Sequence, residues 1–365
     1  MRPEHTTERE GTLEVILANR VGIELTYARS RTTEQLVPIF LPNFAGFSTQ
    51  WANQGTVVGT TLEAQIEARM IAMPDLSWTT MFVFDRPRAK ITEWPGVCQN
   101  VAWRWRCEGH SLFEIWGGQW IRHPEQLLEF HQGGEIAPYL DQFERNDDGF
   151  LVWVGEGNSY TEGESKDLWG TSTTFNGVPY NWGMPFERLL PGGAGSRDQI
   201  GNSNYMNFGW VNTVQIGALS LHAHLHASVG GEIVTEQFGL ERFNTHTAMD
   251  QAGKPDELKK PIQYYHTLAS NRGNSFNVQP ADFLKLRTIS ANYRLTQENL
   301  RRLLLSQVGL ESMTIGLIGQ NMFTLKRCDC TDPEQGLNLN TRSASVGSGA
   351  YPLSRTITME IDVTF

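Results

Sequence analysis

The stretch LSRTITMEIDVTF at residues 353–365 decides the fold class. Its odd-numbered positions are apolar except for one arginine, and its even-numbered positions are all polar. Successive side chains of a β-strand point to opposite faces, so this stretch predicts a strand that separates an apolar environment from a polar one. A soluble sheet with one solvated face and an outer-membrane barrel both give this alternation. The other strands and their connections must therefore decide between the two.

Other segments repeat the same two-residue period. Residues 58–70 alternate most regularly and place Glu63, Gln65 and Glu67 on the polar side. In residues 282–295 the apolar phase changes part-way, which predicts a β-bulge. The remaining expected strands cover residues 12–17, 21–30, 76–84, 206–216, 219–229 and 313–325.

The connections between these strands alternate between short turns and long loops. The long loops are predicted at about residues 36–56, 89–204, 232–280 and 326–352. The strands of a transmembrane barrel run up and down, so short turns gather at the periplasmic rim and long loops gather outside the cell. A soluble sandwich has no reason to sort its connections in this way. The pattern therefore predicts an all-β chain that forms part of a transmembrane β-barrel with long extracellular loops.

Composition narrows the classes of function. The chain has 365 residues, a net charge of -10, 35 glycines and 11 tryptophans. Phosphate groups are neutralised by clustered basic side chains, so a chain this acidic is not expected to bind nucleic acid. No apolar run reaches the roughly 20 residues of a membrane helix. Residues 1–11 lack the basic and apolar regions of a secretory signal, so either the chain is cytoplasmic or its natural beginning lies upstream.

Three stretches together resemble the C-terminal end of the SusC/RagA family of TonB-dependent outer-membrane transporters. They are DFLKLRTISANYRL at 282–295, GQNMFT at 319–324 followed by DPE at 332–334, and YPLSRTITMEIDVTF at 351–365. Two features depart from the family pattern. Lys285 stands where the family more often has arginine, and Cys328 and Cys330 replace an aromatic-rich loop.

The resemblance implies a barrel of about 22 strands in the outer membrane of a Gram-negative cell, of which this chain supplies about nine or ten antiparallel strands at the C-terminal end. A whole family member also has a plug domain and a TonB-contacting segment, is capped by a SusD-like surface lipoprotein, and imports glycans or peptides. The plug domain is absent from these residues. We therefore expect a fragment that is inactive alone and that would reach the TonB complex through the missing N-terminal part.

The last strand carries a second expectation from the resemblance. The barrel assembly machinery is expected to recognise it, and its apolar side is expected to face outer-membrane lipid. The residues assigned to this role are Ile357, Met359, Ile361, Val363 and Phe365.

Two clusters suggest metal or redox chemistry. His222, His224 and His226 alternate along one strand, and they are expected to face the lumen with Glu63, Gln65 and Glu67. Zinc is the alternative, but a flat row of alternate strand residues converges poorly on one tetrahedral ion, so no metal or other cofactor is predicted. The four cysteines Cys98, Cys107, Cys328 and Cys330 allow three pairings, and disulfides are favoured over metal or redox chemistry.

Several loop tryptophans could stack on sugar rings, or they could pack the long loop against itself. The candidates for substrate stacking are Trp103, Trp105, Trp116, Trp120 and Trp153. No nucleophile-elbow, phosphate-loop or zinc-protease motif is present, so an enzyme is not expected. Two functions remain: part of a TonB-dependent nutrient importer, or a surface-exposed glycan-binding β-domain without transport.

Overall fold

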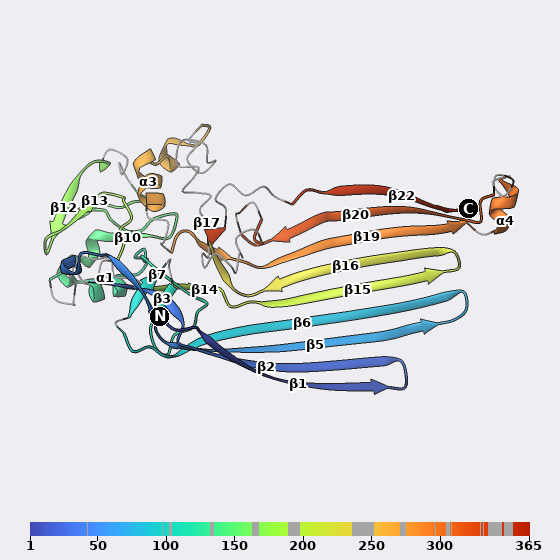
Figure 1. The fold of residues 1–365 in the computed structure, drawn as a ribbon. Helices are drawn as coiled ribbons and strands as arrows, with labels where there is room; N and C mark the ends of the chain where they lie inside the picture. Colours follow the sequence, from blue (N-terminus) through green and yellow to red (C-terminus); the bar gives the residue numbers. More distant parts are fainter. Residues whose placement is uncertain are drawn as a thin grey trace.

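The computed structural model describes residues 1–41, 43–96, 98–101, 104–131, 135–162, 168–188, 198–235, 252–270, 275–295, 297–303, 307, 309–328, 330, 332–334, 345–346 and 353–365. Its main feature is an antiparallel sheet of nine strands in chain order, as the alternation predicted. The strands lie side by side in Figure 1, with the long connections at one end. They are β1 (His5–Leu17), β2 (Val21–Thr33), β5 (Thr56–Ala72), β6 (Leu76–Glu93), β15 (Met206–Ile216), β16 (Leu219–Val229), β19 (Phe283–Leu295), β20 (Ser312–Lys326) and β22 (Thr356–Thr364).

The opposite end of the sheet carries short connections (Figure 1). The turn between β1 and β2 places Ala18 and Asn19 at φ 48° and 51°, the left-handed values of a tight hairpin whose twist matches the flanking strands. Gly217 takes φ 54° in the turn between β15 and β16. The short helix α4 (Gln297–Arg302) lies in the connection between β19 and β20 and buries Leu300.

The predicted bulge is confirmed in β19. The pairing with β20 shifts register between Leu286 and Thr288, and the pairing with β16 shifts between His224 and Leu225. The apolar positions of β19 change from even to odd numbers part-way along the strand. The extra residue of the bulge absorbs this change, so that the apolar side chains stay on one face of the sheet.

The sheet has one apolar face. Cross-strand neighbours share a face, and one register row joins eight strands. Its members are Val15, Ile23, Ile66, Phe82, Trp210, Leu225, Leu286 and Phe323. Many large side chains of this face are exposed in the isolated chain, including Trp210 at 48% and Met359 at 66%. Such an extended exposed apolar surface calls for a partner or a membrane.

The described long connections contain further small elements. In the first and third they are β3 (Leu36–Phe40), η1 (Asn43–Ala45), β4 (Thr49–Asn53), β17 (Glu232–Thr235), η4 (Asp256–Leu258), α3 (Ile262–Ser270) and β18 (Val278–Pro280). In the second they are β7 (Gln99–Val101), β8 (Arg104–Arg106), β9 (Glu114–Gly117), α1 (Pro124–Phe130), η2 (Ala137–Gln142), β10 (Phe143–Arg145), β11 (Leu151–Trp153), β12 (Ser172–Phe175), β13 (Val178–Asn181) and β14 (Asp198–Asn202). The last contains β21 (Ser345–Val346). The alternation of the sequence did not reveal these strands in the second connection, because strands of three to five residues are too short to show a period.

Two of these connections pack together into what we call the loop lobe, the described parts of residues 104–188 and 252–270. Helix α3 adds Tyr264, Tyr265 and Leu268 to a buried cluster that also contains Trp120 and Trp182. A buried lysine, Lys260, joins the same two connections through its ion pairs with Asp147 and Asp148, at 2.6 and 2.7 Å. The lobe therefore has its own core at the end of the sheet.

No helix within the described ranges is long and apolar enough to cross a membrane.

Candidate functional site

The polar face of the sheet gathers the residues that the sequence placed in a lumen. Glu67 lies opposite Met81, Met81 opposite Val211, and Val211 opposite His224. Since cross-strand neighbours share a face, the polar residues of β5 and β16 are on the same side of the sheet, with two strands, β6 and β15, between them. The six residues with this common face are Glu63, Gln65, Glu67, His222, His224 and His226.

The β5 end of this face is acidic. A depression of about 300 Å³ is lined by the carboxylates of Glu24, Glu63 and Asp85. Asn207 of β15 donates its amide to Asp85 at 3.2 Å. The surface has room for a hydrated solute and favours cationic groups over anionic ones.

The histidine row has partners other than a metal. His226 Nδ1 accepts hydrogen bonds from Arg287, at 2.6 Å from Nη2 and 3.2 Å from Nε. Thr213 Oγ1 lies 3.3 Å from His222 Nδ1. A guanidinium is a permanent cation without lone pairs, so it occupies one ligating nitrogen and repels a cation nearby. Among the described residues, no group of three or more histidine, cysteine or acidic side chains is placed to hold a metal ion.

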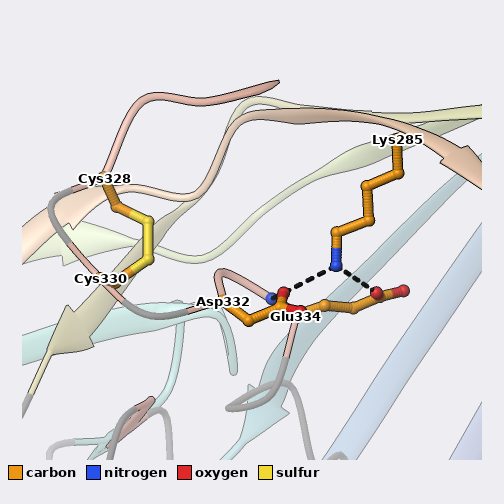
Figure 2. The surroundings of a disulfide bond; sticks show 5 residues. All are labelled: Lys285, Cys328, Cys330, Asp332 and Glu334. Atoms are coloured by element: carbon orange, nitrogen blue, oxygen red, sulfur yellow. Dashed lines mark hydrogen bonds and ion pairs between the residues drawn. A yellow bond between two sulfur atoms is a disulfide. The ribbon is translucent and has the colours of Figure 1, made fainter. Parts of the chain in front are cut away.

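A buried ion network lies where β19 meets the segment after β20 (Figure 2). Lys285 is only 1% exposed, and its Nζ donates to Asp332 Oδ1 at 2.7 Å and Glu334 Oε2 at 2.8 Å. Arg287 binds the other carboxylate oxygen of Glu334, and the backbone N–H of Glu334 donates to Asp332 at 3.0 Å. Both cations come from the polar face of β19, so the network fastens a loop segment onto that face.

The charges in this network stabilise each other. Burial by itself opposes ionisation of Glu334, but hydrogen bonds from Arg287 and Lys285 and their positive charge outweigh it and lower the pKa of that carboxyl to about 2. Glu334 thus remains an anion at any physiological pH. The sequence singled out DPE at 332–334 and Lys285 separately, but nothing in the local pattern indicated that they pair across 47 residues.

The four cysteines form two local disulfides in the structure. Cys98 pairs with Cys107, and Cys328 pairs with Cys330 directly before the ion network (Figure 2). This is one of the three pairings that the sequence left open. Disulfides persist in oxidising compartments, which agrees with connections that lie outside the cytoplasm.

The five tryptophans proposed for substrate stacking have different environments. Trp105 and Trp116 are half-buried and stacked, with ring centroids 5.2 Å apart and planes 21° apart. Glu114 fixes this pair by accepting a hydrogen bond from Trp116 Nε1 at 3.0 Å. Trp153 is half-buried between the two clusters of the loop lobe and donates to Gln142 at 3.1 Å.

Trp120 is the most deeply buried of the four candidates that the structure describes. Trp120 is only 3% exposed in the core of the loop lobe, so it offers no open ring face and packs the loop instead. A loop tryptophan in a sequence cannot be told from a core tryptophan until the loop is known to have a core. Trp103 lies outside the described residues.

Comparison with known proteins gives relatives of one kind. No family model matches the chain. TonB-dependent receptor P3 of Formosa agariphila is 24% identical over 360 residues, a match that covers 95% of this chain and 32% of the receptor. TonB-dependent receptor P26 of the same organism is 20% identical over 382 residues, covering 100% of this chain and 35% of that protein.

Structural comparison agrees. The RagAB peptide transporter superposes with a TM-score of 0.62 at 15% identity, over 99% of this chain and 35% of the matched chain. The RagAB peptide importer in its closed-closed state gives 0.61. This chain is similar over nearly its whole length to part of TonB-dependent receptors, and it has the fold of part of the RagAB transporter. The resemblance to TonB-dependent receptors, the partial β-barrel fold and the outer-membrane location expected from the sequence are confirmed.

The chain spans about a third of the length of the proteins it matches. Its relatives are receptors and transporters rather than enzymes. The comparisons give this region the fold of part of such a receptor, with one apolar and one polar face of the sheet.

Proposed function

We propose that this chain forms part of the wall and the extracellular loops of a TonB-dependent outer-membrane importer of glycans or peptides. The observation that carries the proposal is the two-faced sheet: apolar rows run across its whole width on one side, and acidic, amide and histidine side chains lie on the other. A wall between hydrocarbon and a wet lumen needs this arrangement on every strand. Phe365 and the apolar side of β22 are then the surface that the assembly machinery and the lipid contact.

The loop lobe supports an extracellular binding role. It has a packed core of its own, and it presents the half-buried pair Trp105 and Trp116, whose aromatic faces suit the apolar faces of sugars or of apolar peptide side chains. The structural neighbour is described as a peptide transporter, which favours peptides, whereas the tryptophan pair favours glycans. A SusD-like lipoprotein would cover this end of the barrel, and the TonB complex would act on the opposite, periplasmic side.

The alternative is a surface glycan-binding domain without transport. The tryptophan pair alone would fit it, but it leaves the exposed apolar face of nine strands unexplained. A soluble domain would bury such a surface or interrupt it with polar side chains.

We expect residues 1–365, expressed alone behind a secretion signal, to form no closed pore and to import nothing. The sheet is open, with β1 and β22 at its two edges, and unpaired backbone groups in hydrocarbon cost several kcal/mol each. The readouts are heat-modifiable migration on gels, protease resistance and single-channel conductance, with the complete receptor as the positive control. A protease-resistant, heat-modifiable species with stable conductance would show that these residues close a barrel by themselves.

A further inference from the structure

A band of cations lies on the apolar face of the sheet, near the strand ends that lead into the long connections. We call it the basic band. Its members are Arg9, Arg29, Arg31, Arg86, Arg88 and Lys90. They come from three strands, β1, β2 and β6, with β5 running between the last two.

Strand register brings these cations together. Arg9 lies opposite Arg29, Arg29 opposite Thr60, and Thr60 opposite Arg88, so three guanidinium groups share one row. In the next row towards the loops, the register pairs Arg31 with Val58 and Val58 with Lys90. Arg86 belongs to the adjacent row of the same face in the direction away from the loops, and this row also contains Tyr27. The cations thus occupy three consecutive rows of one face.

The same face turns apolar immediately beyond the basic band. The row after that of Tyr27 contains Leu25, Ala64 and Phe84, and it continues across β15 to Phe208. The basic band therefore lies on the apolar side of the sheet, the side that the proposed function places against hydrocarbon. It is separate from the acidic lumen side.

Few acidic groups balance the band. Arg31 forms an exposed ion pair with Glu93 at 3.1 Å, and Arg88 Nη1 donates to the carbonyl oxygens of Pro87 and Tyr205. The other cations are exposed and take part in no ion pair with the described residues: Arg9, Arg29, Arg86 and Lys90. Like charges in adjacent rows repel one another, and the repulsion grows next to a low-dielectric membrane. Anions from outside the chain would relieve it.

We propose that the basic band binds the phosphate groups of a phosphorylated glycolipid in the outer leaflet. Guanidinium groups match phosphate oxygens in bidentate geometry, and several in one row can hold a headgroup with more than one phosphate. The lipid's acyl chains would lie along the apolar rows directly below, with Tyr27 at the boundary, where aromatic side chains are enriched. The proposal rests on the proposed function for its orientation, with the long connections outside the cell.

The test uses the complete receptor in nanodiscs and lipid A as the probe, in its bisphosphorylated and dephosphorylated forms. The variant R9Q/R29Q/R86Q removes three exposed cations that form no ion pair with the described residues. Arg69→Gln is the matched control on the opposite face, because Arg69 shares the side of Glu67. Native mass spectrometry measures lipid retention, and a salt series measures its electrostatic part.

We expect the receptor to bind bisphosphorylated lipid A on the order of a hundred-fold more tightly than the triple variant does, with R69Q unchanged and the dephosphorylated form weak throughout. Equal binding of the two lipid forms, or full binding by the triple variant, would overturn the proposal. Inorganic phosphate binding as tightly as lipid A would overturn the assignment to lipid.

Two further measurements separate this proposal from the proposed function. Protease cleavage of the loop lobe on intact cells tests the orientation, and substrate import tests transport. Suppose that the triple variant is cleaved and imports substrate like the wild type but no longer retains lipid A. This result would support the proposal that the basic band binds lipid, independently of the transport function. A loop lobe that is protected on intact cells would instead refute the orientation and the proposed function with it.

Discussion

Met359→Lys is expected to block assembly of the receptor in the outer membrane, whereas Thr358→Lys at the adjacent position is expected to assemble almost normally. The two residues point to opposite faces of β22. Met359 lies opposite Leu317 on the apolar face and is 66% exposed, and Thr358 lies opposite Ile318 on the other face. A lysine on the lipid side costs about 2 to 4 kcal/mol near the middle of the bilayer, and a lysine in a wet lumen costs little.

Heat-modifiable migration of the complete receptor, together with its yield in outer-membrane fractions, measures this difference. The two variants add the same charge one residue apart, so a general effect of charge on expression would lower both yields equally. Equal assembly of the two variants would contradict the assignment of the faces of β22.

Lys285→Met is expected to detach the segment after β20 from the sheet. The substitution leaves Asp332, which is 5% exposed, and part of Glu334 without a cation, and removing one partner of a buried ion pair costs about 3 to 5 kcal/mol. The β19–β20 ladder does not depend on this side chain, so the loss should be local. Hydrogen exchange of the Asp332 and Glu334 amides and protease cleavage after β20 measure it.

Lys285→Arg is the control for this prediction. It keeps the positive charge, and a guanidinium can still donate to both carboxylates. We expect slow exchange of the Asp332 and Glu334 amides in this variant, close to that of the wild type. Unchanged protection in Lys285→Met would show that the network contributes little to holding the loop.

The sequence predicted the sheet well because each strand carries its own evidence. A period of two over about ten residues, as in β5 or β22, requires no knowledge of the partner strand. Strand order followed from short turns such as the one at Ala18 and Asn19, which can only join neighbours. Even the bulge in β19 was visible as a change of apolar phase.

The loop lobe and the ion network could not be predicted in the same way. Trp120 and Tyr264 meet in one core although they lie in separate connections, and Lys285 meets Asp332 across 47 residues. Contacts of this kind depend on loop geometry, which leaves no period in the sequence. The basic band could not be predicted from the sequence for a related reason. Arg9, Arg29 and Arg88 lie far apart in the chain, and only the register of four strands brings them into one row.

A cysteine scan along β16 tests the central claim, that this sheet is a wall between lipid and a wet lumen. Single cysteines replace Ser220, Leu221, His222, Ala223, His224 and Leu225 in the complete receptor, reconstituted in lipid nanodiscs and exposed to a water-soluble maleimide. The native cysteines of this chain are paired in disulfides and should not react. We expect fast labelling at 220, 222 and 224 and at least about ten-fold slower labelling at 221, 223 and 225, because lipid covers the second set. Uniform labelling along the strand, or the reverse alternation, would contradict it.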